Sequence, residues 1–206
     1  MEQTFGYYKG HSGNNTKFEF RASGAYIFRP SDQSTTDFIQ RPNVTVYRGP
    51  ISMEIHQEFS PWISQVSRVY KGKQIIVNKK LIFFYLFSNL IFTMIKLFAD
   101  YYSGTQDIEF EWLIGPIPIG DSIGKEIVAK YDVKFDTKES FFTDSNGRQM
   151  LKRIRNYRPT WKLDVTEPVS ANYFPVNSRI FVRDENDQQA TVLTDRSQGG
   201  TSMSKF

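Results

Sequence analysis

The stretch SFFTDSNGRQML, residues 140–151, decides the fold class of this chain. Two runs with apolar residues flank the dipeptide Asn146-Gly147. A tight two-residue hairpin turn needs positive φ at both central positions, and Asn-Gly adopts that conformation more readily than almost any other pair. The stretch therefore predicts a β-hairpin with a side-chain period of two.

The same period continues outward along the chain. In DIEFEWLIGP, residues 107–116, Ile108, Phe110 and Trp112 alternate with acidic residues. Further alternating runs predict strands at 17–30, 45–59, 62–72 and 124–136. Residues 177–195 predict a second hairpin around a polar tip. No convincing run has a capped period of 3.6. The sequence predicts an all-β domain, most simply a large β-sandwich.

The composition excludes several kinds of functional site and partner. The 206 residues are 39% hydrophobic and 23% charged, as in ordinary globular proteins, and contain no cysteine. The absence of cysteine excludes disulfides, zinc sites with cysteine ligands and a thiol nucleophile. The net charge is +4, but basic residues are dispersed among acidic ones, so no nucleic-acid partner is expected.

Residues with catalytic potential form no convincing set. Glu109 and Glu111 lie two apart on a predicted strand, so they share one face at roughly 7 Å, and retaining glycosidases use paired carboxylates about 5 Å apart. The favoured interpretation is a solvated strand face opposite a core face of Phe110 and Trp112. The only histidines, His11 and His56, have no partner at metal-ligand spacing. The sequence predicts no catalytic and no metal-binding residue in this chain.

Five longer motifs occur in a fixed order, namely SGAYIFRP (23–30), EFEWLIGPIPIGD (109–121), FFTDSNGRQMLKRIRNYRPTWKL (141–163), EPVSANYFPVNSRI (167–180) and LTDRSQGG (193–200). Together they resemble the C-terminal β-domain of lysosomal-type α-mannosidases, glycoside hydrolase family 38. The resemblance covers nearly all of residues 1–73 and 105–206.

The resemblance implies an incomplete mutarotase-like β-sandwich that packs, in the whole enzyme, against a catalytic α/β domain and a helical bundle. Members of the family are zinc-dependent retaining hydrolases of terminal α-linked mannose, and they work in the lysosome or are secreted. Their nucleophile, acid/base and Zn²⁺ ligands lie in the N-terminal catalytic domain, whose motifs are not in this sequence. The expected partners are therefore mannose-containing glycans and that catalytic domain, and the chain alone is expected to be inactive. A non-catalytic carbohydrate-binding β-sandwich remains the alternative.

Three residues are candidate sites. The tyrosine of the S-G-A-Y motif, which matches Tyr26, is implied by the resemblance to reach the mannose pocket; the alternative is a tyrosine packed in the core. Asn14 in NNT and Asn43 in NVT begin acceptor sequons for N-glycosylation, which operate only in the secretory pathway.

An apolar segment at about 74–104 interrupts the β pattern, and three explanations compete. Residues 81–99 are long enough for a transmembrane helix, but a span would separate strands that belong in one sandwich. A surface helix inserted there would expose apolar residues all round. The favoured explanation is a translated intron: Ile, Phe, Tyr, Met, Asn and Lys, whose codons are A/T-rich, fill 17 of the 26 positions from Gln74 to Ala99.

Overall fold

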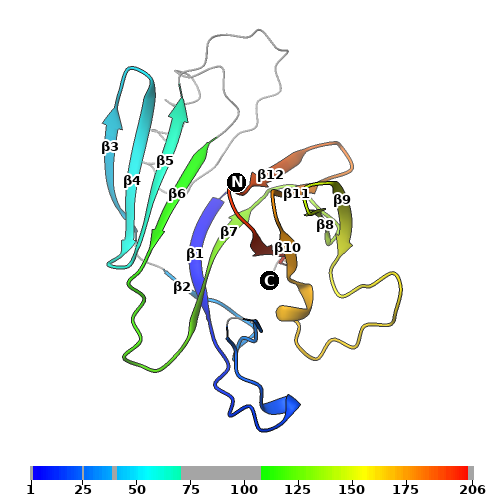
Figure 1. Cartoon of the computed structure of the whole chain (residues 1–206). Helices are drawn as coiled ribbons and strands as arrows, with labels where there is room; N and C mark the ends of the chain where they lie inside the picture. The colour runs from blue at the N-terminus through cyan, green and yellow to red at the C-terminus, as the bar shows by residue number, and fades with distance from the viewer. Residues whose placement is uncertain (1, 25, 39–40, 71–107, 204–206) are drawn as a thin grey trace. The chain divides into compact units, whose positions relative to one another are not determined.

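The computed structural model describes all residues except 1, 25, 39–40, 71–107 and 204–206 (Figure 1). The described residues form thirteen β-strands and two short 3-10 helices. The predicted all-β class is confirmed. No helix among these residues is long and apolar enough to cross a membrane. The expectations for residues 74–104, including a span at 81–99, fall outside the described residues.

The chain divides into two units. Unit 1 comprises residues 1–9 and 34–132, and unit 2 comprises residues 10–33 and 133–206. Each unit is built from antiparallel strand pairs.

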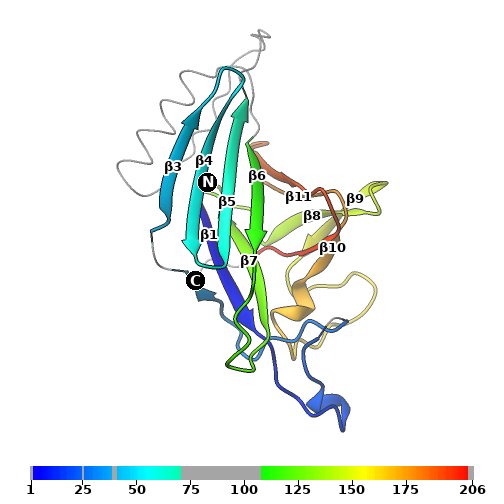
Figure 2. The same cartoon turned by 60° about the vertical axis from the view of Figure 1, so that its left-hand side comes forward.

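Unit 1 contains two sheets that face each other. Their strands are β1 (Glu2–Lys9), β2 (Thr36–Asp37), β3 (Asn43–Arg48), β4 (Ser52–Ser60), β5 (Ile63–Tyr70), β6 (Glu109–Ile114) and β7 (Lys125–Asp132). One sheet has the order β2-β1-β7 and the other β3-β4-β5-β6. Figure 2 shows β3–β6 side by side, with β1 and β7 crossing behind them. This is the sandwich layering that the alternating pattern predicts.

Aromatic residues fill the space between the two sheets of unit 1. Phe5 on β1 is 1% exposed, and its ring lies 4.8 Å from that of Phe59 and 5.2 Å from that of Trp112. The ring centre of Phe110 lies 6.1 Å from that of Tyr131 on β7. The predicted core face of β6 is therefore confirmed. Burial raises the pKa of Tyr131 to about 12, which keeps its hydroxyl protonated in the core.

Unit 1 also buries a polar side chain, Gln65, which is 1% exposed. Its amide exchanges two hydrogen bonds with that of Gln3 on the facing sheet, at 2.8 and 3.0 Å. Its Nε2 also donates to Gln57 Oε1 at 3.0 Å. Because a buried amide without partners is destabilising, these bonds fix how the two sheets register on each other.

Unit 2 contains the two predicted hairpins. Its strands are β8 (Ser140–Ser145), β9 (Gln149–Ile154), β10 (Phe174–Val176), β11 (Arg179–Arg183), β12 (Gln189–Leu193) and β13 (Gln198–Gly200). The sheet orders are β12-β11-β8-β9 and β10-β13. Asn146 and Gly147 have φ of 51° and 70°, so the predicted turn between β8 and β9 is confirmed. Phe141 is fully buried and packs edge-on against Phe174 at 5.6 Å.

Asp144, at the end of β8, joins the hairpin to the segment after β10. The residue is 2% exposed. Its Oδ2 accepts the N–H of Gly147 at 2.7 Å, and Oδ1 accepts those of Asn177, Ser178 and Arg179 at 2.8, 3.0 and 3.2 Å. The N–H of Ser178, with the other three, holds the pKa of this carboxyl far below its usual range, against the opposing effect of burial.

The predicted strand at 17–30 is wrong. This part of unit 2 contains the 3-10 helix η1 (Phe18–Phe20) and only isolated bridges. Asn15 has a φ of 58°; its N–H donates to Phe20 O at 3.0 Å, and its Oδ1 accepts the N–H of Ala22 at 3.0 Å. The backbone is therefore satisfied within a loop rather than by a ladder, which the alternation of apolar residues alone does not reveal.

Candidate functional site

Tyr26 lies at the tip of a turn in unit 2. Gly24 N donates to Ile27 O at 2.9 Å, and Ile27 N donates to Gly24 O at 3.3 Å, so the two residues close the turn. The Tyr26 side chain is fully exposed. The alternative that Tyr26 packs in the core is therefore wrong for the part of the chain that the structure describes. The residue is presented outward, with its ring and its hydroxyl both free to meet a ligand.

Residues 10–33, here called the Tyr26 lobe, are held together by Arg29. Its Nη1 donates to the carbonyl oxygens of Glu19 and Arg21, both at 2.9 Å, and its Nε donates to Glu167 Oε1 at 2.8 Å. Arg29 N donates to Ser23 Oγ at 3.2 Å, beside the start of the turn. The Arg29 guanidinium thus links three segments, and these bonds fix the part of the lobe that carries the exposed tyrosine. Sequence reasoning did not single out Arg29, although it lies in the same motif as Tyr26.

Two further contacts attach the lobe to the rest of unit 2. The ring of Phe28 meets that of Tyr173 edge-on at 4.9 Å. Gln33 Oε1 accepts the N–H of Val169 at 3.0 Å. The lobe is therefore packed on residues 167–173 and does not depend only on its own chain ends for its position.

The Tyr26 lobe exposes further apolar side chains. Phe18 is 81% exposed, and Phe20 and Ile27 are also exposed. The guanidinium of Arg21 lies 5.7 Å from the centre of the Phe18 ring. Large apolar side chains gathered on one lobe are typical of a surface that contacts another part of a protein or a ligand.

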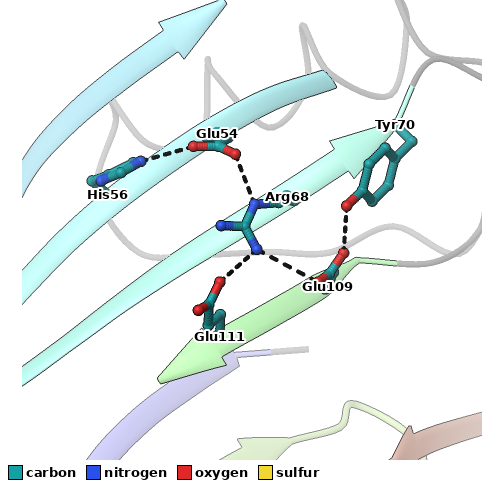
Figure 3. Close-up of polar contacts among 6 residues, drawn as sticks. All are labelled: Glu54, His56, Arg68, Tyr70, Glu109 and Glu111. Atoms are coloured by element: carbon teal, nitrogen blue, oxygen red, sulfur yellow. Dashed lines mark hydrogen bonds and ion pairs between the residues drawn. The ribbon is translucent and has the colours of Figure 1, made fainter. Parts of the chain in front are cut away.

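Glu109 and Glu111 lie together on the outward face of β6, as Figure 3 shows, and both contact one guanidinium. Arg68 Nη1 donates to Glu111 Oε2 at 2.6 Å and lies 3.5 Å from Glu109 Oε1. Arg68 Nε donates to Glu54 Oε1 at 2.7 Å. Both glutamates are exposed, opposite the inward Phe110 and Trp112. The predicted solvated face of β6 is therefore confirmed.

The remaining members of this network extend it along the same face (Figure 3). His56 Nε2 contacts Glu54 Oε2 at 2.9 Å, and the Tyr70 hydroxyl donates to Glu109 Oε2 at 2.7 Å. His56, with Arg68, lowers the pKa of Glu54, and the hydrogen bond to Glu109 raises the pKa of Tyr70. Glu54, with Glu111, raises the pKa of Arg68. These contacts form a surface ion-pair cluster on the outward face of the sheet.

The two sequons occupy different settings. Asn14 is exposed, and its Oδ1 accepts the backbone N–H of Thr16 at 3.1 Å and the Thr16 hydroxyl at 2.8 Å. Asn43 is the first residue of β3, and both Asn43 and Thr45 are exposed. Each asparagine has room for a modification in the folded chain.

The described residues do not fit a metal centre. They hold no group of three or more His, Asp or Glu side chains that could bind an ion. His11 uses its backbone N–H and carbonyl to bond Arg29 and Ser23, and His56 belongs to the Arg68 network.

Comparison with known proteins gives one family. A family model described as "Glycosyl hydrolases family 38 C-terminal domain" matches residues 1–205. The chain is 42% identical over 203 residues to a protein named lysosomal alpha-mannosidase from Homo sapiens, covering 98% of this chain and 17% of that protein. It is 43% identical over 204 residues to the protein of that name from Cavia porcellus, covering 99% of this chain and 17% of that protein. It is 37% identical over 204 residues to an alpha-mannosidase from Canavalia ensiformis, covering 98% of this chain and 17% of that protein.

Proposed function

Because the chain belongs to the glycosyl hydrolase family 38 C-terminal domain family, we propose that it forms part of an enzyme that removes terminal α-linked mannose from glycans with retention of configuration. The observation that carries this proposal is the 42% identity over 98% of the chain to a lysosomal alpha-mannosidase. The chain spans 17% of the length of the curated relatives it matches. The catalytic carboxylates and the zinc ion of the proposed reaction are accordingly assigned to the part of the parent protein outside this chain.

In this proposal, the chain supplies structural support and one contact to the substrate. The Tyr26 lobe is the surface through which unit 2 meets the catalytic domain, since it exposes Phe18, Phe20 and Ile27 as well as the tyrosine. Tyr26 then offers a ring face to the sugar and a hydroxyl to its oxygens. The firm base that Arg29 provides supports this role, because a substrate contact is useful only when its position is fixed.

The parent enzyme is proposed to be lysosomal or secreted. Two findings support this location: several relatives carry the name lysosomal alpha-mannosidase, and both sequon asparagines, Asn14 and Asn43, are exposed. Asn14 or Asn43 is proposed to carry a glycan in the parent protein. A shift in gel mobility of the native enzyme after glycosidase digestion is the expected result.

The proposal is tested by assaying two preparations with an α-mannoside. The purified parent protein is expected to release mannose with retained anomeric configuration, measured by NMR in the first turnovers. The isolated 206-residue chain is expected to release none, because the proposed catalytic carboxylates belong to the part of the parent protein outside this chain. A parent protein that binds mannosides without hydrolysing them would favour the alternative, a non-catalytic carbohydrate-binding β-sandwich.

Residues 74–104 are proposed to derive from a retained intron. Long-read sequencing of the native transcript is expected to join the codons near Lys73 to those near Thr105. Mass spectrometry of the native enzyme is expected to find no peptide from within residues 81–99. A transcript that keeps the segment, together with membrane fractionation of the protein, would instead support a single-pass membrane protein.

A further inference from the structure

We propose that the glycan on Asn43 covers the open edge of the sheet β3-β4-β5-β6. The inference rests on the proposed function only through the secretory route that goes with it. It assigns to one sequon a structural role that the mannosidase activity does not require.

Among the described residues, the strand β3 is an outer strand whose only charge, Arg48, lies at its last position. It is the outer strand of its sheet, and the described residues place no strand beside its free side. It pairs with β4 in continuous register from Asn43↔Glu58 to Arg48↔Met53, with no bulge. Its first five residues, Asn43 to Tyr47, carry no charge and no proline, and β-branched and aromatic side chains predominate. Such an edge is a template for pairing with another chain.

The opposite edge of the same sheet shows the contrast. On β6, Glu109 and Glu111 place two negative charges among six residues. Charges on an edge strand oppose pairing with a second copy, because the copy would bring like charges together. On β3 the single charge, Arg48, lies at the far end of the strand, and the Asn43 sequon begins at the uncharged end.

The position of Asn43 suits a large substituent. Asn43, Thr45 and Tyr47 alternate onto the outward face of the sheet, opposite Glu58, His56 and Glu54 on β4. This is the face that holds the Arg68 network, not the face that packs on β1 and β7. The Asn43 side chain is exposed and makes no hydrogen bond with other described residues, whereas that of Asn14 is engaged by Thr16. A glycan on Asn43 would therefore displace no packed group, and its bulk would sweep the edge and the outward face.

The modification is a transfer of an oligosaccharide from a lipid pyrophosphate donor. The Asn43 Nδ2 attacks the anomeric carbon of the first sugar. The N–C bond forms as the bond from that carbon to the pyrophosphate oxygen breaks, so the lipid pyrophosphate leaves and the amide nitrogen gives up one proton. Thr45 supplies the hydroxyl that the sequon requires.

The test uses the full-length parent protein, secreted from eukaryotic cells, with three variants. Asn43→Gln and Thr45→Ala both remove the sequon, and Thr45→Ser keeps it. Glycopeptide mass spectrometry is expected to find glycan on Asn43 in the wild type and in T45S. Size-exclusion chromatography of secreted protein is expected to show that the monomer fraction of N43Q and T45A is about threefold or more lower, because the rest has aggregated. The mannosidase activity per monomer is expected to be unchanged.

Each outcome decides a separate part of the inference. An unmodified Asn43 peptide in the wild type would overturn the inference as a whole. A modified Asn43 with N43Q and T45A as monomeric as T45S would refute the protection of the edge. An inactive parent protein with a glycosylated Asn43 would contradict the proposed function and leave this inference standing.

Discussion

Replacing Asp144 with alanine is expected to lower the thermal midpoint of the unfolding step that includes unit 2 by about 5–10 °C. Four backbone N–H groups converge on this one buried carboxylate, and alanine leaves all four without an acceptor. Unpaired buried donors are strongly destabilising. Differential scanning calorimetry of the parent protein measures the midpoint. Hydrogen exchange of a peptide spanning residues 176–180 gives a local measure, and amide exchange there is expected to accelerate on the order of 100-fold.

The control for this prediction is Asp184→Ala. Asp184 Oδ1 also accepts two backbone N–H groups, those of Asn186 and Gln188, at 2.9 and 2.8 Å. It lies at the polar tip between β11 and β12, where water can replace the lost oxygen, so the midpoint is expected to change by less than about 2 °C. Asp144→Asn keeps one oxygen and is expected to fall between wild type and alanine. Equal midpoints for D144A and D184A would contradict the assigned role.

The pH dependence follows from the direction of the Asp144 pKa. The folded-state pKa is depressed, so the carboxylate stabilises the fold fully above the unfolded value of about 3.9. This stabilisation is lost only as the pH falls below that value toward the folded-state pKa. The difference in midpoint between wild type and D144A is therefore expected to stay constant from pH 7 to about pH 5 and to shrink in stronger acid.

Local signals in the sequence predicted the hairpins well. The Asn146-Gly147 turn and the alternation on either side are read from neighbouring residues, and both appear where predicted. The same holds for the outward glutamates of β6. These features depend on φ preference and on the two-residue period, and both act within a few positions of the chain.

Features that depend on distant residues were missed. β1 escaped prediction because its register with β7, from Glu2↔Asp132 to Lys9↔Lys125, is set far along the chain. Gly6 also interrupts its pattern, and the structure explains why: a Cβ there would lie 2.6 Å from Asp37 Oδ1 on the adjoining β2. The contact of Asp144 with residues 177–179 could not be predicted from neighbouring residues either, because these residues lie far along the chain. Its bond to Gly147 is an ordinary turn contact.

The Tyr26 lobe shows a different limit. Its alternating apolar residues are typical of a strand, yet Phe18 and Phe20 are exposed and the backbone turns on itself. Alternation predicts a strand only when one face has a core to cover, and Phe18 and Phe20 have none among the described residues. The proposed role of Tyr26 rests on the resemblance to a family, and the structure adds its exposure and the contacts of Arg29 in the same lobe.

Replacing Tyr26 with phenylalanine in the parent enzyme is expected to lower kcat/KM for an α-mannoside by about tenfold, and Tyr26→Ala by about 100-fold or more. Phenylalanine removes only the hydroxyl and its hydrogen bonds to the sugar, whereas alanine also removes the ring face. Because the side chain is fully exposed within the described chain, neither variant is expected to change the thermal midpoint of the isolated chain by more than about 1 °C. Steady-state kinetics with an aryl mannoside and calorimetry measure the two effects.

Two controls separate a substrate contact from a general effect of surface substitution. Tyr157→Phe removes the hydroxyl of another exposed tyrosine of unit 2, one outside the lobe, and is expected to leave kcat/KM within about twofold. Glu111→Gln tests the carboxylate pair on β6 and is also expected to have little effect, because Glu111 is held by Arg68 on a solvated face. Unaltered kinetics in Y26F and Y26A would remove Tyr26 from the mannose site. A large loss of kcat/KM in E111Q would instead indicate that the outward face of β6, with its ion-pair cluster, contacts the substrate.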